Sequence, residues 1–327
     1  MKDERKRLLA KIAYMYYIEE KSQTQIAKEL SIYRTTICRH LAKAKSEGIV
    51  RIEISDFDTK LFQLEDYVRQ KYGIEKIELV ADIASDRPEE VLTKVARAAA
   101  ELVRQTISDG NRVGLSWGSS ISSMIDELDG KSLKDISVLP LAGGPSHINA
   151  KYHVNTLVYR LARIFHGEST FINAMVIQEN VALSQGISGS KYFQTILKDW
   201  QQLDLAIVGI GGEPNETQES QWRDLLTAED YEELRQQDAV GEICCRFFNE
   251  KGQAVYQNLQ DRTIGIDLEQ LREVPKTIAI ASGTEKAKAI QAALKSGVIN
   301  CLVTDRTTIL AVLALEGDKQ INNFLAE

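Results

Sequence analysis

The sequence is poor in cysteine, histidine and proline: its 327 residues include 4 Cys, 4 His and 5 Pro. The cysteines are Cys38, Cys244, Cys245 and Cys301. None belongs to a C-x-x-C pair, and histidines are too sparse nearby to complete a zinc site. These scarcities argue against a disulfide framework and give no reason to expect a metal or another cofactor. Reduced thiols are typical of a cytoplasmic protein, which is the location we expect.

Long hydrophobic runs are absent as well. No apolar run approaches the roughly 20 residues that a membrane-spanning helix requires. The N-terminus also lacks the apolar segment of a signal peptide. The sequence therefore predicts no membrane partner.

Charge is distributed unevenly along the chain. The net charge is −7, yet residues 1–50 hold 11 Lys and Arg against 6 Asp and Glu, and the remainder holds 29 against 41. A basic head on an acidic body suits a nucleic-acid-binding domain joined to another domain, because only the head must displace counterions from phosphate. We expect a DNA-binding domain at 1–55 and an effector-binding and oligomerisation domain at 56–327.

Residues 23–48 have the apolar spacing of a helix-turn-helix. The apolar positions are Ile26, Ala27, Leu30, Ile32, Ile37, Leu41 and Ala44. The second helix is predicted from about Arg34 to Ser46, with its polar face outward. Residues 6–19 have helical spacing too and should pack behind this pair. The alternative is an amphipathic helical hairpin with no role in DNA binding.

The outer face of the second helix has side chains that suit a DNA groove. Arginine can bind guanine edges, whereas threonine and lysine mostly hold phosphates. The candidate DNA-binding residues are Tyr33, Arg34, Thr35, Thr36, Cys38, Arg39 and Lys43. Two residues depart from the usual turn, since Ser31 stands where glycine is common and Tyr33 cannot cap a helix as serine does. Residues 49–55 alternate in polarity and predict a strand, either a short wing or an exit strand.

From residue 77 onward, short apolar runs alternate with amphipathic helices. The runs are 77–81, 112–117, 136–142, 204–210, 276–282 and 300–304. The helices between them are expected at 88–107, 119–128, 154–165, 191–200, 229–236 and 285–295. Nearly continuous apolar strands separated by helices predict an open, Rossmann-like α/β sheet of parallel strands covered on both faces. Before it, the helix at 61–72 is a candidate dimer contact through Leu61, Leu64 and Val68.

In such a sheet, ligands bind beyond the carboxyl ends of the strands. Four strands lead into glycine-bearing loops, and the candidate effector-binding residues there and nearby are Gly118, Ser119, Ser120, Gly143, Gly144, Asn155, Gly211, Glu242 and Lys286. Gly118–Ser120 open a helix, where backbone N–H groups favour an anion such as phosphate. Lys286 lies near another helix N-terminus, where a cation is unfavourable unless an anion binds. Each glycine is equally suited to an ordinary sharp turn.

Other polar residues are assigned structural roles. Arg246 is expected to hold the fold by an ion pair, and His147 and His153 should be surface or core residues. No catalytic residues are predicted, because no Asp–Glu or Asp–His cluster of the kind that catalyses sugar isomerisation follows the third sheet loop. G-x-S-x-G after a strand and G-x-G-x-x-G are both absent.

Six ordered motifs resemble the SorC family of sugar-responsive bacterial transcription regulators. They are QTQIAKELSIYRTTICRHLAKAKSEGIV, VGLSWGSS, LPLAGGP, LAIVGIGG, GEICCRFFNEKG and IAIASGTEKAKAI with INCLVTD. The resemblance covers nearly the whole chain. It implies a helix-turn-helix followed by an effector domain similar in fold to glucosamine-6-phosphate deaminase and ribose-5-phosphate isomerase.

The resemblance also implies site residues and partners. Gly118, Ser119 and Ser120 would form the phosphate-binding loop, and Lys286 would contact the phosphate. Glu242 stands where the family often has Asp, and Tyr33 and Cys38 stand where Ser is usual. We expect a regulator of a carbohydrate-utilisation operon that binds double-stranded operator DNA and a sugar or sugar-phosphate effector, as a homodimer or homotetramer. The alternative is a sugar-phosphate isomerase or deaminase with an appended DNA-binding head.

Overall fold

The computed structural model describes residues 2–50, 58–83, 85–145, 150–215, 222 and 225–324. The chain divides into two compact units, Met1–Phe57 and Asp58–Glu327. The division falls two residues after the boundary proposed from the sequence. Among the described residues, no helix combines the length and hydropathy needed to cross a membrane.

The described part of the first unit, residues 2–50, contains three helices, α1 (Lys2–Tyr17), α2 (Gln23–Leu30) and α3 (Arg34–Ser46). The bounds predicted for the second helix of the pair are confirmed by α3. Its apolar residues fall at i, i+4 and i+7, so one stripe is buried. The core consists of Leu9, Ile12, Ala13, Met15, Ile26, Ile37, Leu41 and Ala44.

The turn between α2 and α3 forms without the glycine and the capping serine or threonine that are usual in such turns. Ser31 adopts a left-handed conformation with φ of +53°, the conformation for which glycine is normally selected. Tyr33 precedes α3 without a side-chain cap hydrogen bond. The other end of α2 is conventional, because the Ser22 hydroxyl accepts from the Gln25 N–H at 3.3 Å and Gln25 accepts from the Ser22 N–H at 2.8 Å.

The strand predicted at 49–55 lies mostly outside the described residues. Ile49 and Val50 are described, and they pack beside Leu9 and Ala44. The Val50 N–H also donates to the Ala44 carbonyl at 3.1 Å. These two residues therefore close the core of the first unit.

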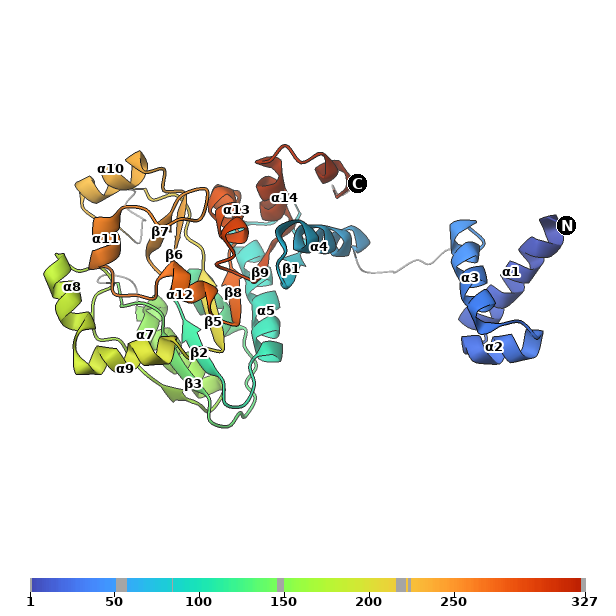
Figure 1. The fold of residues 1–327 in the computed structure, drawn as a ribbon, viewed down its shortest axis with the longest axis horizontal. Coiled ribbons are helices and arrows are strands. Elements are labelled where there is room, and N and C mark those ends of the chain that lie inside the picture. Colours follow the sequence, from blue (N-terminus) through green and yellow to red (C-terminus); the bar gives the residue numbers. More distant parts are fainter. Residues whose placement is uncertain are drawn as a thin grey trace. The chain divides into compact units, whose positions relative to one another are not determined.

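The second unit is built on a seven-stranded sheet whose paired strands are all parallel (Figure 1). The strands of this sheet are β1 (Lys76–Val80), β2 (Arg112–Leu115), β3 (Ser137–Pro140), β4 (Glu168–Ser169), β5 (Leu205–Gly209), β8 (Lys276–Ile280) and β9 (Cys301–Asp305). Their order is β1-β9-β8-β5-β2-β3-β4. The strands β6 (Gly241–Ile243) and β7 (Arg246–Phe248) form a separate antiparallel hairpin. The six strands predicted from apolar runs are confirmed, and β4, β6 and β7 are additions.

Helices connect the strands of this unit. The α-helices are α4 (Thr59–Tyr72), α5 (Pro88–Thr106), α6 (Ser119–Asp126), α7 (Val154–Ile164), α8 (Val181–Ser188), α9 (Lys191–Trp200), α10 (Ala228–Gln236), α11 (Gln257–Arg262), α12 (Leu268–Arg272), α13 (Ala287–Ser296) and α14 (Arg306–Ala314). Three 3-10 turns accompany them: η1 (Ala150–Tyr152), η2 (Thr284–Lys286) and η3 (Lys319–Asn323). The six predicted helices are confirmed within a few residues at each end, except that the last begins as η2 and continues as α13.

The central strands are buried on both faces, as predicted. Successive residues of a strand point to opposite faces, yet all five residues of β9 and four of five in β5 and β8 are buried. One of the covering helices is α5, which contacts β1, β8 and β9 and lies beside them in Figure 1.

The helix proposed as a dimer contact, α4, packs three of its apolar side chains within its own unit. Leu64 and Val68 are fully buried within the core of their own unit, because α4 packs this face against β1. Leu61 is partly buried against the same core. These side chains are therefore occupied within the chain.

Replacing Ile37 by alanine should destabilise the first unit alone. Ile37 is fully buried between the three helices, and truncating such a side chain costs about 2–5 kcal/mol. All three tryptophans, Trp117, Trp200 and Trp222, lie in the second unit. Far-UV circular dichroism should therefore show an earlier partial transition, while the tryptophan fluorescence transition stays unchanged.

The matched control is the neighbouring exposed residue Cys38. Its change to alanine should leave both transitions within error of wild type. A tryptophan transition that moves with Ile37→Ala would show that the two units unfold together.

Candidate functional site

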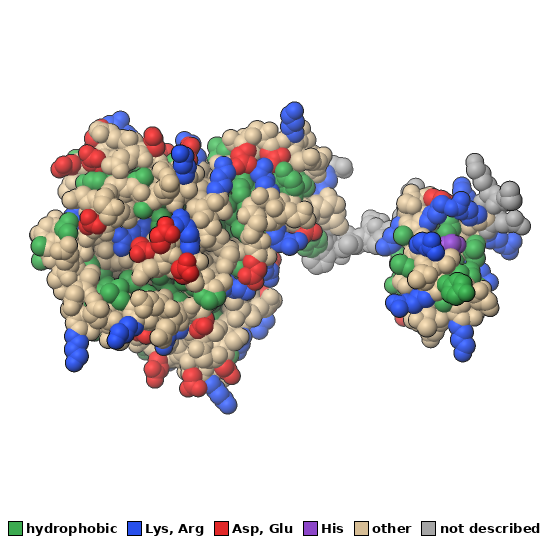
Figure 2. Space-filling view, in the orientation of Figure 1, with side chains coloured by type: hydrophobic (Ala, Val, Ile, Leu, Met, Phe, Trp, Pro, Cys, Tyr) green, Lys and Arg blue, Asp and Glu red, His purple; other side chains and the backbone are tan. Residues whose placement is uncertain are grey.

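The outer face of α3 carries the predicted DNA-binding side chains. Exposed residues there are Tyr33, Arg34, Thr35, Cys38 and Arg39, while Thr36 and Lys43 are partly exposed. Tyr33 is 85% exposed, and Lys43 pairs with Glu47 at 3.5 Å. Basic side chains outnumber acidic ones on the visible face of this unit in Figure 2. The helix thus presents arginines without close acidic partners among the described residues, as a groove-binding helix requires.

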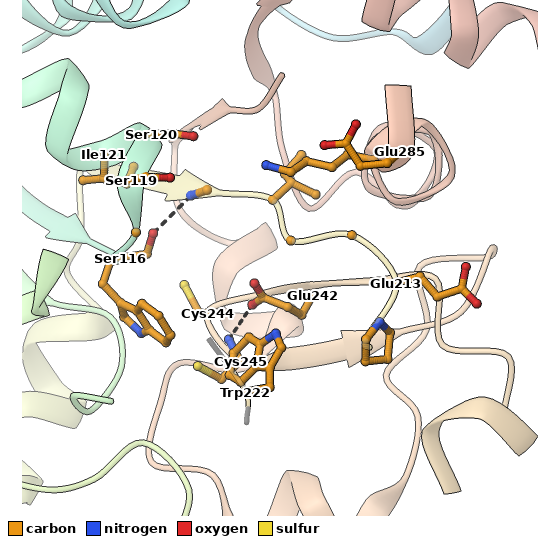
Figure 3. Close-up of a pocket in the computed structure, with 18 of the residues that line it drawn as sticks. Ser116, Ser119, Ser120, Ile121, Glu213, Trp222, Glu242, Cys244, Cys245 and Glu285 are labelled. Carbon is orange, nitrogen blue, oxygen red and sulfur yellow. Dashed lines mark hydrogen bonds between the residues drawn. The ribbon is translucent and has the colours of Figure 1, made fainter. Parts of the chain in front are cut away.

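The second unit has a cavity of about 590 Å³, within the size range of small-molecule sites. Loops that follow β2, β5 and β8 line it, together with the hairpin β6–β7 (Figure 3). Of the predicted effector-binding residues, it gathers Gly118, Ser119, Ser120, Gly211, Glu242 and Lys286. Segments as distant as 116–121 and 285–286 in the sequence therefore meet in one site.

The loop after β2 presents the N-terminus of α6 to the cavity. Gly118 is the N-cap, with φ of +124° and no side-chain cap hydrogen bond. The first N–H groups of a helix have no partner within the helix, so those of α6 are available to an anion. Just before them, Ser116 accepts from the Gly209 N–H at 3.1 Å and ties the ends of β2 and β5 together. The hydroxyls of Ser119 and Ser120 face the cavity in Figure 3.

Glu242 is a buried carboxylate in the wall of this cavity. Its Oε2 accepts from the Cys245 N–H at 2.9 Å, and its side chain is near Lys286. Burial raises the pKa of Glu242 to about 7, although the Cys245 N–H and the charge of Lys286 act to lower it.

The side chain of Glu242 lies so close to residue 211 that only glycine fits there. The two residues form an antiparallel bridge, with N–H···O distances of 3.0 and 3.1 Å. A Cβ on Gly211 would lie 2.2 Å from Glu242 Oε1, so any side chain would displace the carboxylate. This glycine therefore serves close packing rather than a turn.

Cys244 and Cys245 form the two-residue turn of the β6–β7 hairpin and line the cavity. Both have left-handed backbone conformations, with φ of +53° and +65°. Such turns normally use Asn-Gly, so this turn is strained beside the site. Burial raises the pKa of both thiols, which are therefore neutral.

Aromatic side chains form another part of the cavity wall. Trp117 and Trp222 both line the cavity, with ring centroids 5.6 Å apart. Trp222 also packs against Phe247 at 5.2 Å. The sequence analysis missed the tryptophans and the two cysteines as lining residues, although Trp117 immediately precedes the predicted phosphate loop.

Lys286 reaches the cavity from the N-cap of α13. It is partly exposed, and no ion pair among the described residues includes it. Its position at the start of a helix is unfavourable for a cation. The expected conflict between charge and helix dipole is therefore present.

Gly143, Gly144 and Asn155 are described but do not line the cavity. The segment after β3 is instead paired with neighbouring backbone, since the Gly143 N–H donates to Ile264 at 2.9 Å and the Gly144 N–H to Ala174 at 3.0 Å. Both amide ends of Asn155 bond the backbone of Ile172, at 3.0 and 3.2 Å. These three residues stabilise the fold around the site.

Arg246 is structural, but its partners differ from the ion pair expected. It is buried and donates to the carbonyls of Gln260, Gly265 and Ile266 at 2.6, 2.6 and 3.1 Å. His153 caps α7 by accepting from the Asn155 N–H at 3.3 Å, and burial lowers its pKa. His147 lies outside the described residues.

A helix-turn-helix unit joined to a parallel α/β unit with a ligand-sized cavity is the arrangement expected of a ligand-responsive transcriptional regulator. Residues 58–314 match the family described as "Putative sugar-binding domain". The chain is 37% identical over 305 residues to the sorbitol operon regulator of Klebsiella pneumoniae, covering 92% of this chain and 96% of that protein. It is 29% identical to the deoxyribonucleoside regulator of Bacillus subtilis, covering 96% of this chain and 99% of that protein.

Solved structures agree with these relatives. The full-length sorbitol operon regulator SorC from Klebsiella pneumoniae superposes with a TM-score of 0.74 at 35% identity, covering 95% of this chain and 99% of that one. A transcriptional regulator from Streptococcus pneumoniae TIGR4 superposes with a TM-score of 0.77 at 46% identity, covering 80% of this chain and 100% of that one. The chain belongs to the SorC family of transcriptional regulators.

Replacing Glu242 by glutamine should remove one pH-dependent contribution to stability. Because the pKa in the folded state exceeds the unfolded value of 4.5, this group stabilises the fold most in acid and loses that contribution as pH rises toward about 7. Between pH 5 and 8, wild type should lose about 2–3 kcal/mol relative to Glu242→Gln. Urea unfolding followed by tryptophan fluorescence measures this difference. Parallel pH profiles for the two proteins would contradict the assigned burial of a titrating carboxyl.

Proposed function

We propose that this chain regulates a carbohydrate-utilisation operon by binding operator DNA through α3 and a sugar phosphate in the cavity of the second unit. The observation that carries the proposal is the cavity itself, where the uncapped N-terminus of α6 and Lys286 lie with a buried carboxylate. The names of two relatives refer to sorbitol and to deoxyribonucleosides, which fits an effector rich in hydroxyl groups.

The phosphate is proposed to lie between Gly118–Ser120 and Lys286. Free N–H groups at a helix N-terminus bind anions, and a bound phosphate would remove the unfavourable placement of Lys286 beside the α13 terminus. Ser119 and Ser120 add hydroxyl donors on the same side. The phosphate supplies most of the affinity in this arrangement.

The sugar is proposed to lie toward Glu242 and the tryptophans. Glu242 offers oxygens to sugar hydroxyls, and Trp117 and Trp222 offer flat apolar surfaces to ring or chain carbons. Gly211 contributes by leaving room for Glu242. Gly143, Gly144 and Asn155 support the fold nearby and are not proposed as contacts.

A chain of contacts leads from the cavity to the start of the second unit. The Gly283 N–H beside η2 donates to Thr308 Oγ1 at 2.8 Å, and Thr308 donates to Asp305 at 2.6 Å. The next residue, Arg306, is buried and pairs with Asp58, the N-cap of α4. Asp58 follows the segment that joins the two units in sequence, so this route is proposed to carry the effector's influence toward the DNA-binding unit.

Regulation requires two quaternary or conformational states that bind the effector with different affinity. One helix-turn-helix touches too little duplex for tight specific binding, so two or more copies should present paired α3 helices to operator half-sites. A homodimer or homotetramer is therefore proposed.

The fold would allow the enzyme alternative, and one feature of the site favours it, since the near-neutral pKa of Glu242 would suit a general base. Isomerisation of a sugar phosphate also needs an acid for ring opening, and no histidine is among the described lining residues. We therefore propose binding without turnover. Steady conversion of pentose or hexose phosphates by purified protein would favour the enzyme instead.

Alanine at Arg34 or Arg39 should reduce sequence-specific DNA binding. Loss of an arginine contact to a base costs about 1–3 kcal/mol on the operator, with a smaller loss on random DNA. Fluorescence anisotropy with an operator selected from random duplexes measures both affinities. Lys43→Ala is the control for a phosphate contact and should weaken both DNAs about equally. Equal losses for the arginine variants would show that they bind phosphate only.

Lys286→Ala should weaken sugar-phosphate binding without unfolding the chain. A charge-assisted contact contributes about 1.5–3 kcal/mol, so affinity should fall about ten-fold or more. Thermal-shift titration with matched sugars and sugar phosphates reports this, since a ligand that binds the native state raises the melting temperature. Operator binding without effector should remain near wild type.

The matched control is Lys288→Ala, an exposed lysine two residues along the same helix. It should respond to sugar phosphates as wild type does. If free sugars raised the melting temperature of wild type as much as their phosphates do, the proposed phosphate site would be wrong.

A further inference from the structure

Helix α8 is apolar in composition, yet almost none of it is buried. Its eight residues include no charged side chain, and Ser184 is the one among them that is buried. Leu183 is 46% exposed, and Val181 and Ile187 are partly buried. A surface helix normally turns its apolar side chains toward the core of its own domain. The α8 helix instead presents apolar side chains to its surroundings.

More exposed apolar side chains come from the segments beside α8. Phe171, Met175 and Tyr192 are 37%, 39% and 52% exposed. Tyr192 lies at the start of α9, which contacts α8, and its hydroxyl donates to the Phe171 carbonyl. The α8 helix lies at the edge of the second unit in Figure 1. Exposed apolar side chains that gather in this way are typical of a protein–protein contact.

The described chain gives Gly186, in the second half of α8, no reason to be glycine. Its φ is not in the left-handed region, and a Cβ added there would meet no described atom within 4 Å. Alanine would therefore fit, and it would favour the helix, because glycine is a poor helix former. The missing side chain indicates that room is kept for a contact on the outside of α8.

Charged residues flank α8 on both sides, and none lies between them. Glu179 precedes the N-cap residue, Lys191 follows at the start of α9, and both are exposed. Residues 180–190 contain no charged residue, although such residues make up 27% of the chain. Two α8 helices packed antiparallel about a two-fold axis would bring Glu179 of each copy toward Lys191 of the other. Gly186 lies beside the midpoint of this segment, so the surface complements itself in both shape and charge.

We propose that α8 pairs antiparallel with α8 of a second copy of this chain, with Gly186 at the centre of the contact. Leu183 of each copy packs over the space that Gly186 of the other leaves open. The inference rests on the proposed homo-oligomer and names the surface that forms it. The other helix considered for this role, α4, uses Leu64 and Val68 within its own unit.

A short route joins α8 to the effector cavity. Arg246 belongs to the β6–β7 hairpin at the cavity, and it donates to the Gly265 carbonyl at 2.6 Å. The adjacent Ile264 N–H donates to the Val176 carbonyl at 2.7 Å. The chain enters α8 shortly after Val176. A contact between copies at α8 would therefore adjoin the backbone that holds one wall of the effector site.

Sedimentation equilibrium of the full chain tests the contact. Gly186→Leu places a branched side chain at its centre, in a direction that the described unit leaves open, so the variant should fold. Wild type should sediment as a dimer or tetramer. Gly186→Leu should give a species of half that mass, with the dissociation constant raised about 100-fold or more. Its far-UV circular dichroism and its thermal shift with sugar phosphate should match those of wild type.

The matched control is Ala314→Leu. Ala314 is the exposed last residue of α14, which lies on the other side of the unit in Figure 1. This change also adds apolar bulk to an exposed helix, and it should leave the mass of wild type unchanged.

Charge reversal tests whether the occupant is a second copy. Glu179→Lys or Lys191→Glu alone would bring like charges together and should raise the dissociation constant about ten-fold at low salt. The double variant restores opposite charges across the contact and should associate as wild type does. Both changes are unfavourable for the dipole of α8, so this rescue cannot arise from a more stable helix. Additive losses in the double variant would contradict a pairing of two copies through α8.

The remaining outcomes separate this inference from the proposed function. If Gly186→Leu keeps the wild-type mass and a normal spectrum, the oligomer uses another surface, and the inference alone is overturned. If Gly186→Leu loses its fold, residues of the same chain cover α8, and the inference is overturned as well. Wild type that stays monomeric at micromolar concentration, with and without operator, would contradict the proposed paired heads, and the inference would fall with them.

Discussion

The cavity exists because two neighbouring strands send the chain in opposite directions. β2 and β5 pair side by side, but the chain leaves β2 toward β3 on one side and leaves β5 toward β8 on the other. Their following loops therefore diverge and open a crevice at the carboxyl edge of the sheet. The hydrogen bond from Gly209 to Ser116 fixes the two strand ends at the floor of this crevice. The α6 terminus, the β6–β7 hairpin and η2 are all arranged around that point.

The position of Lys286 at the N-cap of α13 supports the proposed phosphate site. A lysine at a helix N-terminus is unfavourable without an anion, and the proposed phosphate would remove that conflict. The strained Cys244–Cys245 turn belongs to the same arrangement, because its N–H holds the carboxylate in place. A protein that stores such unfavourable contacts can respond to a ligand that relieves them.

Periodicity made much of the fold predictable. The bounds of α3, the parallel sheet and the burial of its strands followed from apolar spacing. Positions after strands or in a recognised motif also identified six residues that line one cavity: Gly118, Ser119, Ser120, Gly211, Glu242 and Lys286. Gly143 and Gly144 do not line it, because their backbone pairs with distant segments, and Asn155 does not, because its side-chain amide bonds the backbone of Ile172. The Cys-Cys turn was missed since such hairpin turns normally contain Asn-Gly. Trp222 was missed because it belongs to no strand end, and only tertiary packing brings it to Trp117.

The most direct test of effector control is the reciprocity of the two affinities. Operator Kd should be measured with and without saturating sugar phosphate, and sugar-phosphate Kd with and without saturating operator. If the cavity and α3 are thermodynamically coupled, both ratios must differ from one by the same factor. We predict equal ratios of about five-fold or more, the usual range for coupled sites. Operator affinity that is unchanged at saturating sugar phosphate would contradict the account.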